Sequence, residues 1–256
     1  MADYRKLLYS VEQGVAHITL NRPHKRNALD AELVGEIRQA LDTSVADESL
    51  RIVLLVGAGK DFCSGADLAA LEQRLSQASV RENIADARRW GDLFIAMRRH
   101  PRPIVAAVRG RALAGGCGLA TAADIVLAAE SAQFGYPEVK IGFVPAMVMA
   151  ILRRSVPEKR AFELLVSGEV ISAAAALEMG MINRVFADAT FESEVAAYVS
   201  RLTAQSTSAL HLTKSLLYQM DALSFEAAIS AGVEMNALAR TTADYRRGIE
   251  QFLKKS

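Results

Sequence analysis

The stretch from Ile104 to Glu138 constrains the fold more than any other part of this 256-residue chain. It begins with an apolar run at 104–108, passes through the glycine-rich turn 109–118, and continues through a second apolar run at 125–129 to a Pro-Glu loop. This order predicts a buried strand, a tight turn, a short helix of small residues and another buried strand. Glycines where a strand enters a helix leave backbone N–H groups free, and the helix dipole favours negative charge there. The stretch therefore predicts an anion site made of backbone.

Three interpretations of this turn are open from the residues alone. Small residues can simply let a helix pack closely on a sheet. A dinucleotide-binding turn is a second interpretation, although Thr121 stands where the third glycine of that motif belongs. The third is a hole for an oxyanion that forms during a reaction. A nucleotide P-loop is excluded, because no Gly-Lys-Ser/Thr follows the glycines.

Size and composition are those of an ordinary globular protein. Hydrophobic residues make up 51% and charged residues 23%, and Lys+Arg 30 against Asp+Glu 29 leave a net charge of +1, which gives no sign of a nucleic-acid surface. Cys63 and Cys117 make neither a disulfide framework nor a metal-binding spacing, so we expect a reducing compartment and no metal. The chain shows neither a signal peptide nor an apolar run of about 18 residues, so we expect a cytoplasmic protein that does not enter a membrane.

Strand and helix patterns alternate over most of the chain. Strands are predicted at 7–11 and 15–20, which flank Gln13-Gly14 as a hairpin, and at 51–57 and 181–186. Helices are predicted at 30–41, capped by Asp30, at 80–99, with an apolar stripe from Ile84 to Met97, and at 147–152, 158–166 and 172–180. This alternation is typical of the α/β class. From about Phe191 the strand patterns stop, and only helices are predicted, at 210–217, 225–238 and 243–253, with a break at Thr241 and Thr242. The expected division is a core over 1–190 and a helical region over 191–256, whose exposed apolar faces favour packing onto another subunit.

A second glycine-bearing loop, 57–68, follows the apolar strand at 51–57 and offers another set of free N–H donors. Ser64 in this loop suggests a nucleophile, but Phe62 stands where a Gly-x-Ser-x-Gly elbow needs glycine, and no base accompanies it. None of the four histidines lies in a recognisable motif. A nucleophilic hydrolase is therefore a rival interpretation that these residues support weakly.

Several short motifs occur along the chain in a characteristic order and spacing. They are Asn21-Arg22-Pro23 with Asn27-Ala28-Leu29, Phe62-Cys63-Ser64-Gly65-Ala66-Asp67-Leu68, Ala114-Gly115-Gly116-Cys117-Gly118-Leu119-Ala120, Ala123-Asp124-Ile125, Phe134-Gly135-Tyr136-Pro137-Glu138-Val139 with Gly142, and Gly180-Met181-Ile182-Asn183-Arg184-Val185. Together they resemble the enoyl-CoA hydratase/isomerase (crotonase) superfamily over essentially the whole chain. The resemblance implies a crotonase-like spiral of β-β-α units, followed by a helical trimerisation region. It also implies a homotrimer or a dimer of trimers.

The resemblance further implies an acyl-CoA thioester as the ligand. The family holds the carbonyl oxygen of the thioester between two backbone N–H groups, which match Ala66 and Gly115. Such donors stabilise an enolate-like charge far more than they stabilise the neutral thioester. Hydratases of the family carry two glutamates, of which the second matches Glu138 and the first matches Gly118, which has no side chain. CoA is part of the substrate, and no separate cofactor is expected.

One carboxylate leaves two reactions open. The first expectation is hydration of a 2-enoyl-CoA by Glu138 with the water held by backbone, as similar bacterial proteins called hydratases imply. The alternative is a 3-enoyl to 2-enoyl-CoA isomerase, since a single base can move a proton between two carbons. A non-catalytic acyl-CoA-binding relative is a further alternative. Asp124 is expected to support the turn and to take no part in the reaction.

The resemblance also implies a CoA-binding surface made of segments that are far apart in the sequence. Its expected members are Arg22, Lys25 and Arg26 for the phosphates, Ser64, Asp67 and Leu68 near the adenine, Ala66 and Gly115 at the thioester, and Phe252 and Lys255 from a neighbouring subunit. Walls of the acyl pocket are expected within 69–90 and 143–148.

Overall fold

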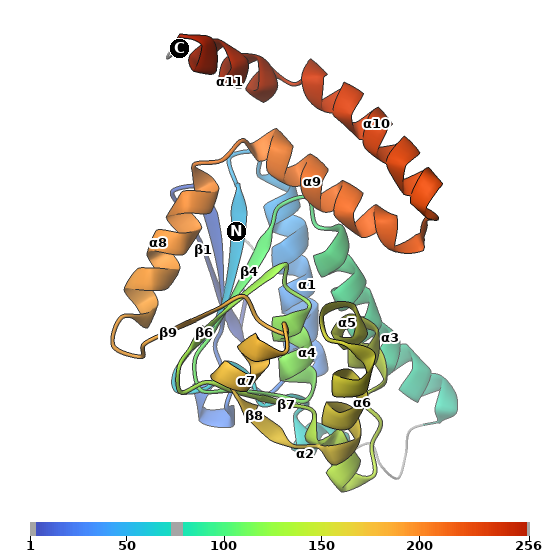
Figure 1. The fold of residues 1–256 in the computed structure, drawn as a ribbon. Helices are drawn as coiled ribbons and strands as arrows, with labels where there is room; N and C mark the ends of the chain where they lie inside the picture. The colour runs from blue at the N-terminus through green and yellow to red at the C-terminus, as the bar shows by residue number, and fades with distance from the viewer. Residues whose placement is uncertain (1–3, 73–78, 255–256) are drawn as a thin grey trace.

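In the computed structural model, which describes residues 4–72 and 79–254, the chain is built around a six-stranded sheet (Figure 1). Strands β1 (Leu7–Glu12) and β2 (Val15–Leu20) form an antiparallel hairpin through Gln13 and Gly14, which both have positive φ. Glycine adopts such a φ at little cost, and the flanking strands need it for a two-residue turn. The predicted hairpin is confirmed.

The other four strands of this sheet run parallel to β2, in the order β1-β2-β3-β4-β6-β9. They are β3 (Ile52–Gly57), β4 (Ile104–Val108), β6 (Ile125–Ala129) and β9 (Arg184–Phe186). β4 is buried along its whole length, as expected for a parallel strand covered on both faces. β9 is shorter than the predicted strand at 181–186, because Asn183 pairs with Val126 through one backbone and one side-chain hydrogen bond. The predicted α/β class is confirmed.

Strand–strand–helix units recur along the chain as β1-β2-α1, β4-β5-α4 and β6-β7-α5. A second sheet, which the sequence did not predict, contains β5 (Arg111–Leu113), β7 (Gln133–Gly135) and β8 (Val170–Ser172). The helices of the core are α1 (Ala31–Ala46), α2 (Leu68–Glu72), α3 (Val80–Arg99), α4 (Gly115–Thr121), α5 (Ala146–Ser155), α6 (Glu158–Ser167) and α7 (Ala173–Glu178). Asp30 caps α1 as predicted, because its side chain accepts a hydrogen bond from the Leu33 N–H at 2.9 Å.

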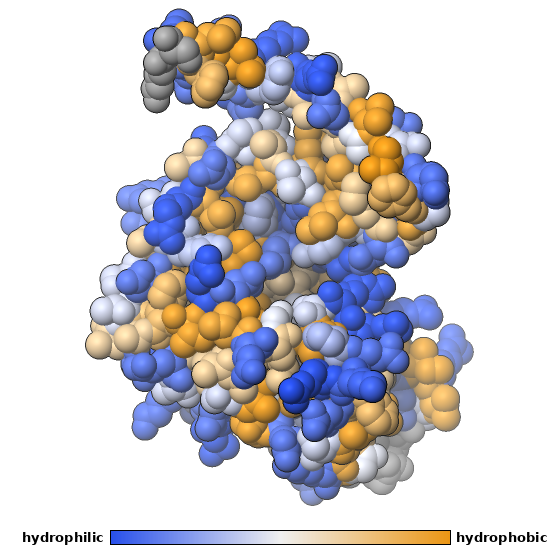
Figure 2. Space-filling view, in the orientation of Figure 1, coloured by the Kyte–Doolittle hydropathy of each residue, from blue (hydrophilic) through white to orange (hydrophobic). Residues whose placement is uncertain are grey.

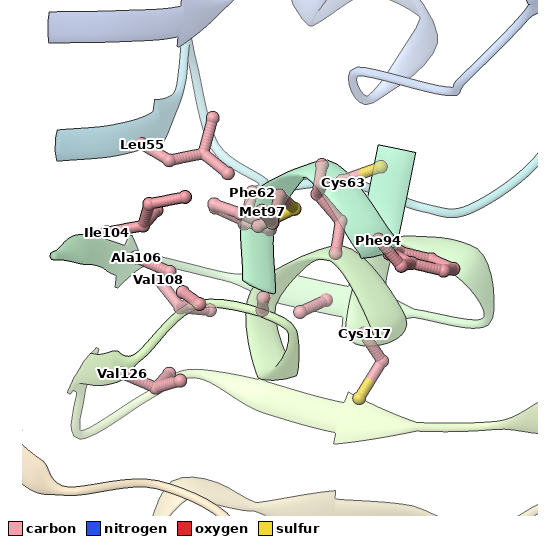
Figure 3. Close-up of a cluster of buried hydrophobic side chains, with 14 of the residues drawn as sticks. Leu55, Phe62, Cys63, Phe94, Met97, Ile104, Ala106, Val108, Cys117 and Val126 are labelled. Carbon is pink, nitrogen blue, oxygen red and sulfur yellow. The ribbon is translucent and has the colours of Figure 1, made fainter. Parts of the chain in front are cut away.

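Helices cover both faces of the large sheet. The main core lies beneath α1, α3 and α4, and Figure 3 shows the part of it around Phe94 and Met97 of α3. The predicted apolar stripe of α3 is buried only in its second half, since Ile84 in the first half is 56% exposed. On the other face of the sheet, α8 (Phe191–Thr203) packs Val195 and its neighbours against Leu54 of β3. The first helix of the predicted helical region thus packs onto the sheet of the core.

Helix α9 (Thr207–Gln219) is joined to the core by a buried ion pair. Lys214 Nζ donates to Asp124 Oδ2 at 2.6 Å and to the carbonyl oxygens of Met97 and Arg102 at 3.0 and 3.1 Å. The Tyr218 hydroxyl donates to the other oxygen of Asp124 at 2.5 Å. Burial lowers the pKa of Lys214, and the charge of Asp124 opposes that shift. Asp124 therefore links α9 to the core, and the support expected from it for the glycine-rich turn stays a prediction.

The last two helices, α10 (Phe225–Thr241) and α11 (Ala243–Leu253), form a C-terminal arm that extends away from the sheet (Figure 1). The break between them lies at Thr242, whose side chain caps α11, as the two threonines at this point indicate. Figure 2 shows hydrophobic surface, in orange, along the arm. The exposed apolar side chains of α10 and α11 are Phe225, Ile229, Val233, Leu238, Ile249, Phe252 and Leu253. Across 4–72 and 79–254, none of the helices combines the length and apolarity needed to cross a bilayer.

Candidate active site

Two loops carry the amides predicted to bind an oxyanion, and the first of them, 58–67, follows β3. Leu29 exchanges two backbone hydrogen bonds with the residues on either side of Ala66, both at 2.8 Å. Cys63 exchanges two more with β5, both at 3.0 Å. The backbone around Ala66 is therefore held on one side by the segment before α1 and on the other by β5.

The second loop turns sharply at Ala114, which has a φ of 51° and donates its N–H to Gly135 O at 2.8 Å. A positive φ is costly for alanine, and it brings the start of α4 against the first loop. A Cβ atom placed on Gly65 would lie only 2.8 Å from Ala114 Cβ and 3.3 Å from Gly115 N. Glycine at position 65 therefore lets the two loops touch.

The N–H groups of Ala66 and Gly115 donate to no acceptor within the described residues. Gly115 is the first residue of α4, where an N–H has no partner inside the helix and the helix dipole is positive. Two unpaired amides thus lie on adjoining loops. It stays a prediction that the N–H groups of Ala66 and Gly115 point at the same oxygen atom.

The side chain of Trp90 covers the start of α4. A Cβ atom on Gly115 would lie 2.9 Å from Trp90 Cζ3, so the indole lies directly against the backbone of the second loop. One residue along α3, a Cβ on Gly91 would lie 3.8 Å from Met147 Sδ of α5. Apolar cover of this kind lowers the local dielectric, which strengthens a hydrogen bond from an amide to a negative oxygen.

Gly118 faces two apolar side chains. A Cβ atom built there would overlap Val148 of α5, at 2.2 Å from Cγ1, and would lie 3.4 Å from Phe94 Cζ of α3. Both side chains are buried. The position that matches the first glutamate of the two-acid hydratases therefore lies against hydrocarbon.

Glu138 lies in a short 3-10 helix (η2, Pro137–Ile141) and is the candidate acid/base. Its side chain is buried, with the residue 9% exposed, and Oε2 has no hydrogen-bond partner within the described residues. Burial raises the pKa of Glu138 above its ordinary value. Its charge in turn adds to the burial that raises the pKa of Cys117, in the first turn of α4, to about 12. A buried carboxylate without a partner, near the start of α4, has the environment of a proton-transfer group.

The basic loop, residues 21–27, contains one buried cation and two exposed ones. Arg22 is buried, and its guanidinium donates to Asp67 Oδ2 at 2.9 Å and lies 3.2 Å from Asp30 Oδ2. Burial alone would raise the pKa of Asp67, but hydrogen bonds from Arg22 and Lys25 hold it below its ordinary value. Arg22 is thus occupied by internal carboxylates, whereas Lys25 and Arg26 face solvent.

Asn27 and Asp61 help to position the loop that carries Ala66, and neither had a predicted role. Asn27 has a left-handed φ of 54°, and its amide Nδ2 donates to the carbonyl oxygens of Ala58 and Asp61 at 2.9 and 2.8 Å. The Asp61 carboxylate accepts two hydrogen bonds from the Arg111 side chain, at 2.8 and 3.0 Å. These contacts tie the basic loop and β5 to the loop that carries Ala66. The left-handed preference of asparagine was the one signal in the sequence that could have indicated the first of them.

The nucleophile interpretation of Ser64 gains no support from the structure. In the part of the chain that is described, no hydrogen bond joins the Ser64 side chain to a histidine. His100 is buried against Ser44, 2.8 Å from its Oγ, and His211 bonds to the carbonyl oxygen of Pro101 at 3.1 Å. The described residues also contain no cluster of His, Cys, Asp and Glu suited to a metal ion.

The predicted CoA-binding residue Phe252 lies in the last helix of the arm. Phe252 is 71% exposed on α11, and Lys255 lies outside the described residues. On the core, Leu68 is exposed at the start of α2, and Ser64 is half-buried with its N–H bonded to Arg26 O at 3.0 Å. Contact of any of these residues with CoA stays a prediction.

Comparisons with known proteins agree with this geometry. Residues 10–256 match the sequence model of a family described as "Enoyl-CoA hydratase/isomerase". The chain is 40% identical over 249 residues to the "Putative enoyl-CoA hydratase" of Thermus thermophilus, which covers 97% of this chain and 98% of that protein. It is 32% identical over 250 residues to the 1,2-epoxyphenylacetyl-CoA isomerase of Escherichia coli, with 97% and 95% covered. The crystal structure of an enoyl-CoA hydratase from Mycobacterium smegmatis superposes with a TM-score of 0.93 at 33% identity, covering 98% of this chain and 97% of that one.

Proposed function

Since the chain belongs to the enoyl-CoA hydratase/isomerase family, we propose that it hydrates a 2-enoyl-CoA thioester with Glu138 as the single acid/base. The observation that carries this proposal is the buried Glu138 carboxylate, whose Oε2 has no partner among the described residues. A carboxylate that burial makes more basic can take a proton and return it.

The proposed hydration needs one carboxylate and two amides. The oxygen of a water molecule adds to C3 of the thioester while Glu138 takes one proton from that water. The π electrons of the C2–C3 bond move toward the thioester carbonyl and form an enolate, whose oxygen accepts hydrogen bonds from the N–H groups of Ala66 and Gly115. Glu138 then returns its proton to C2. The amides act on charge that exists only after addition begins, and losing one such donor typically costs about 10²–10³ in rate.

CoA is proposed to bind along the basic loop, with Lys25 and Arg26 as the cations that contact its phosphates. Both side chains face solvent, whereas Arg22 is already bonded to Asp67. The Lys25 ammonium lies 3.2 Å from Asp67 Oδ2. The Lys25 side chain is 45% exposed, and the buried Asp67 carboxylate keeps its hydrogen bond from Arg22, so the Lys25 ammonium can turn to a phosphate without leaving Asp67 unpaired.

The proposed assembly is a homotrimer or a dimer of trimers formed through the C-terminal arm. Its support is the apolar face of α10 and α11, where Phe225 is 76% exposed in the single chain. Contact with a neighbouring copy would bury this face. It would also bring Phe252 and Lys255 of one chain towards the CoA bound to the other. Analytical ultracentrifugation of the wild type and of a Phe225→Asp variant tests this assembly, and a wild type that is monomeric at micromolar concentration would contradict it.

Isomerisation of a 3-enoyl-CoA to a 2-enoyl-CoA is the second candidate. Gly118 favours it, because the α4 side of the site contributes no second carboxylate. In this reaction Glu138 takes a proton from C2, a dienolate forms on the same two amides, and the proton returns to C4 as the double bond moves to C2–C3. One residue suffices for both transfers.

Steady-state rates on 2-enoyl-CoA and 3-enoyl-CoA substrates, measured for the wild type and for Glu138→Gln, test both candidates. Glu178→Gln serves as the matched control, because Glu178 is exposed on α7. Hydration faster than isomerisation supports the first candidate, and hydration at least about 100-fold slower favours the second. Acyl-CoA binding with no turnover of either substrate would leave only a binding role.

A further inference from the structure

We infer that Val148 determines the reaction specificity of this site, because its side chain occupies the volume that a second catalytic group on α4 would need. The inference rests on the proposed function of Glu138 and deepens it. The quantity that Val148 is inferred to control is the ratio of the hydration rate to the isomerisation rate.

The contact between Val148 and Gly118 leaves no room for a side chain. A Cβ atom at position 118 would lie 2.2 Å from Val148 Cγ1 and 3.3 Å from its Cβ. Gly118 cannot move away easily, because its N–H donates to Ala114 O at 3.0 Å and its carbonyl oxygen accepts from the Ala122 N–H at 2.9 Å. The backbone of α4 is therefore fixed at the point of overlap.

Val148 cannot turn aside at low cost either. It lies in the first turn of α5, and a valine in a helix is restricted to one strongly preferred side-chain rotamer. Val148 is only 5% exposed, and Phe94 Cζ lies 3.4 Å from the same Cβ position. Figure 3 shows Phe94 of α3 beside the short helix that carries Cys117. The side chains that a Cβ at position 118 would meet are thus hydrocarbon.

A wall of this composition cannot hold a reacting water. An ordered water needs two to four polar partners, and neither valine nor phenylalanine offers one. A water that adds to C3 must then be held by Glu138 and by backbone groups alone, whereas moving a proton from C2 to C4 needs no water at all. Filling the space beside Gly118 with Val148 therefore lowers the rate of hydration relative to that of isomerisation.

The test measures kcat/KM for hydration and for isomerisation in Gly118→Glu, in Val148→Ala and in the double variant. We expect the double variant to raise the ratio of hydration to isomerisation at least about tenfold, because it restores a second carboxylate in a space that can hold it. Gly118→Glu alone is expected to melt at a lower temperature than the double variant. A ratio in the double variant within about threefold of the wild type would overturn the inference.

A pair of smaller variants keeps the inference testable if the glutamate variants do not fold. Replacing glycine by alanine inside a helix normally stabilises a protein. We expect Gly118→Ala to lower the melting temperature when Val148 is present and to raise it in the Val148→Ala background. Gly35→Ala is the control, because a Cβ at Gly35 of α1 meets nothing within 4 Å. Equal effects of Gly118→Ala in both backgrounds would show that Val148 does not close this space.

Failure of the proposed function has a separate signature. If Glu138 is the acid/base, Glu138→Gln loses both reactions. Retention of both rates in Glu138→Gln would overturn the role of Glu138, while the ratio measured in the 118 and 148 variants would still report on Val148.

Discussion

Replacing Glu138 by glutamine should make the protein more stable and inactive at the same time. The substitution keeps the shape of the side chain and removes its charge. In the wild type that charge is buried, and Oε2 has no partner among the described residues. The folded protein therefore carries a group whose ionised form it disfavours, in agreement with the raised pKa of Glu138 that burial causes.

The expected gain follows from the cost of an unsatisfied buried group. Leaving a buried polar atom without a partner costs about 1–3 kcal/mol, and more if it is charged. Glutamine still has two polar atoms in the same place, so the variant recovers only part of this cost, about 1 kcal/mol. At about 2.1 cal/mol/K per residue, unfolding of 256 residues has an entropy of about 0.5 kcal/mol/K, so the melting temperature should rise by about 2 °C.

The stability that Glu138→Gln gains over the wild type should increase with pH. Below about pH 4.3, the ordinary pKa of glutamate, the carboxyl is protonated in both the folded and the unfolded chain, and wild type and variant should be alike. As the pH rises through that value and then through the raised pKa of the folded state, the wild type loses stability relative to the variant. Above the folded pKa the difference should stay constant.

Melting temperatures from pH 4.5 to 8.5, compared at equal protein concentration because assembly contributes to stability, measure this effect. Turnover of Glu138→Gln should fall by about 10²–10⁴ over the same range, since general acid–base catalysis contributes that much. Glu178→Gln should show neither change. A variant less stable than the wild type at pH 8, or a stability difference that does not vary with pH, would refute the reasoning.

Three further substitutions test the supports of the site. Gly65→Ala should destabilise the fold by about 1–3 kcal/mol in urea and lower turnover, because position 65 has a φ of 91° and its Cβ would meet Ala114; unchanged stability would contradict this contact. Lys214→Met should cost about 3–5 kcal/mol, since it leaves Asp124 buried without a cation; a loss below 1 kcal/mol would show that α9 is held by other contacts. Lys25→Met should raise KM for acyl-CoA and change stability by less than about 1 kcal/mol, and an unaltered KM would exclude phosphate contact there.

The backbone of the site could be predicted because glycines mark it. Gly65 is required by the close approach of Ala114, and Gly115 by the indole of Trp90. Both lie at the turns where the sequence predicted free N–H groups. Glu138 was identified through the family's motif, and its burial could not be inferred from the Pro-Glu loop alone.

Contacts between distant segments could not be predicted from the sequence. The resemblance implied that Arg22 binds phosphate, which stays a prediction. The bond from Arg22 to Asp67 could not be foreseen, because Asp67 becomes its neighbour only through the pairing of Leu29 with the loop after β3. Nothing in the sequence around Lys214 distinguishes it from a surface lysine. It is buried because α9 crosses the core beside Asp124. In both cases the partner is determined by packing between elements.

Short elements and exposed faces were also beyond the sequence patterns. The strands of the second sheet have three residues each, too few for an alternating pattern to be detected. The stripe on α3 predicted burial of Ile84, which is exposed, because the first half of the helix extends beyond its packing partners. The helical pattern after Phe191 could not indicate that α8 covers the sheet, since periodicity identifies an apolar face without identifying what it contacts.

Because Gly65 packs directly against Ala114, the two amide-bearing loops form one unit that cannot be altered in one loop without affecting the other. This limits which substitutions the protein can accept during evolution. Substitutions within that unit disturb every substrate alike, because the thioester is common to all of them. The helices α3 and α5, which supply Trp90 and Val148 from outside the unit, can be altered separately. Directed evolution towards a new acyl group or a new reaction should therefore accumulate its useful mutations on those two helices and leave the loops untouched.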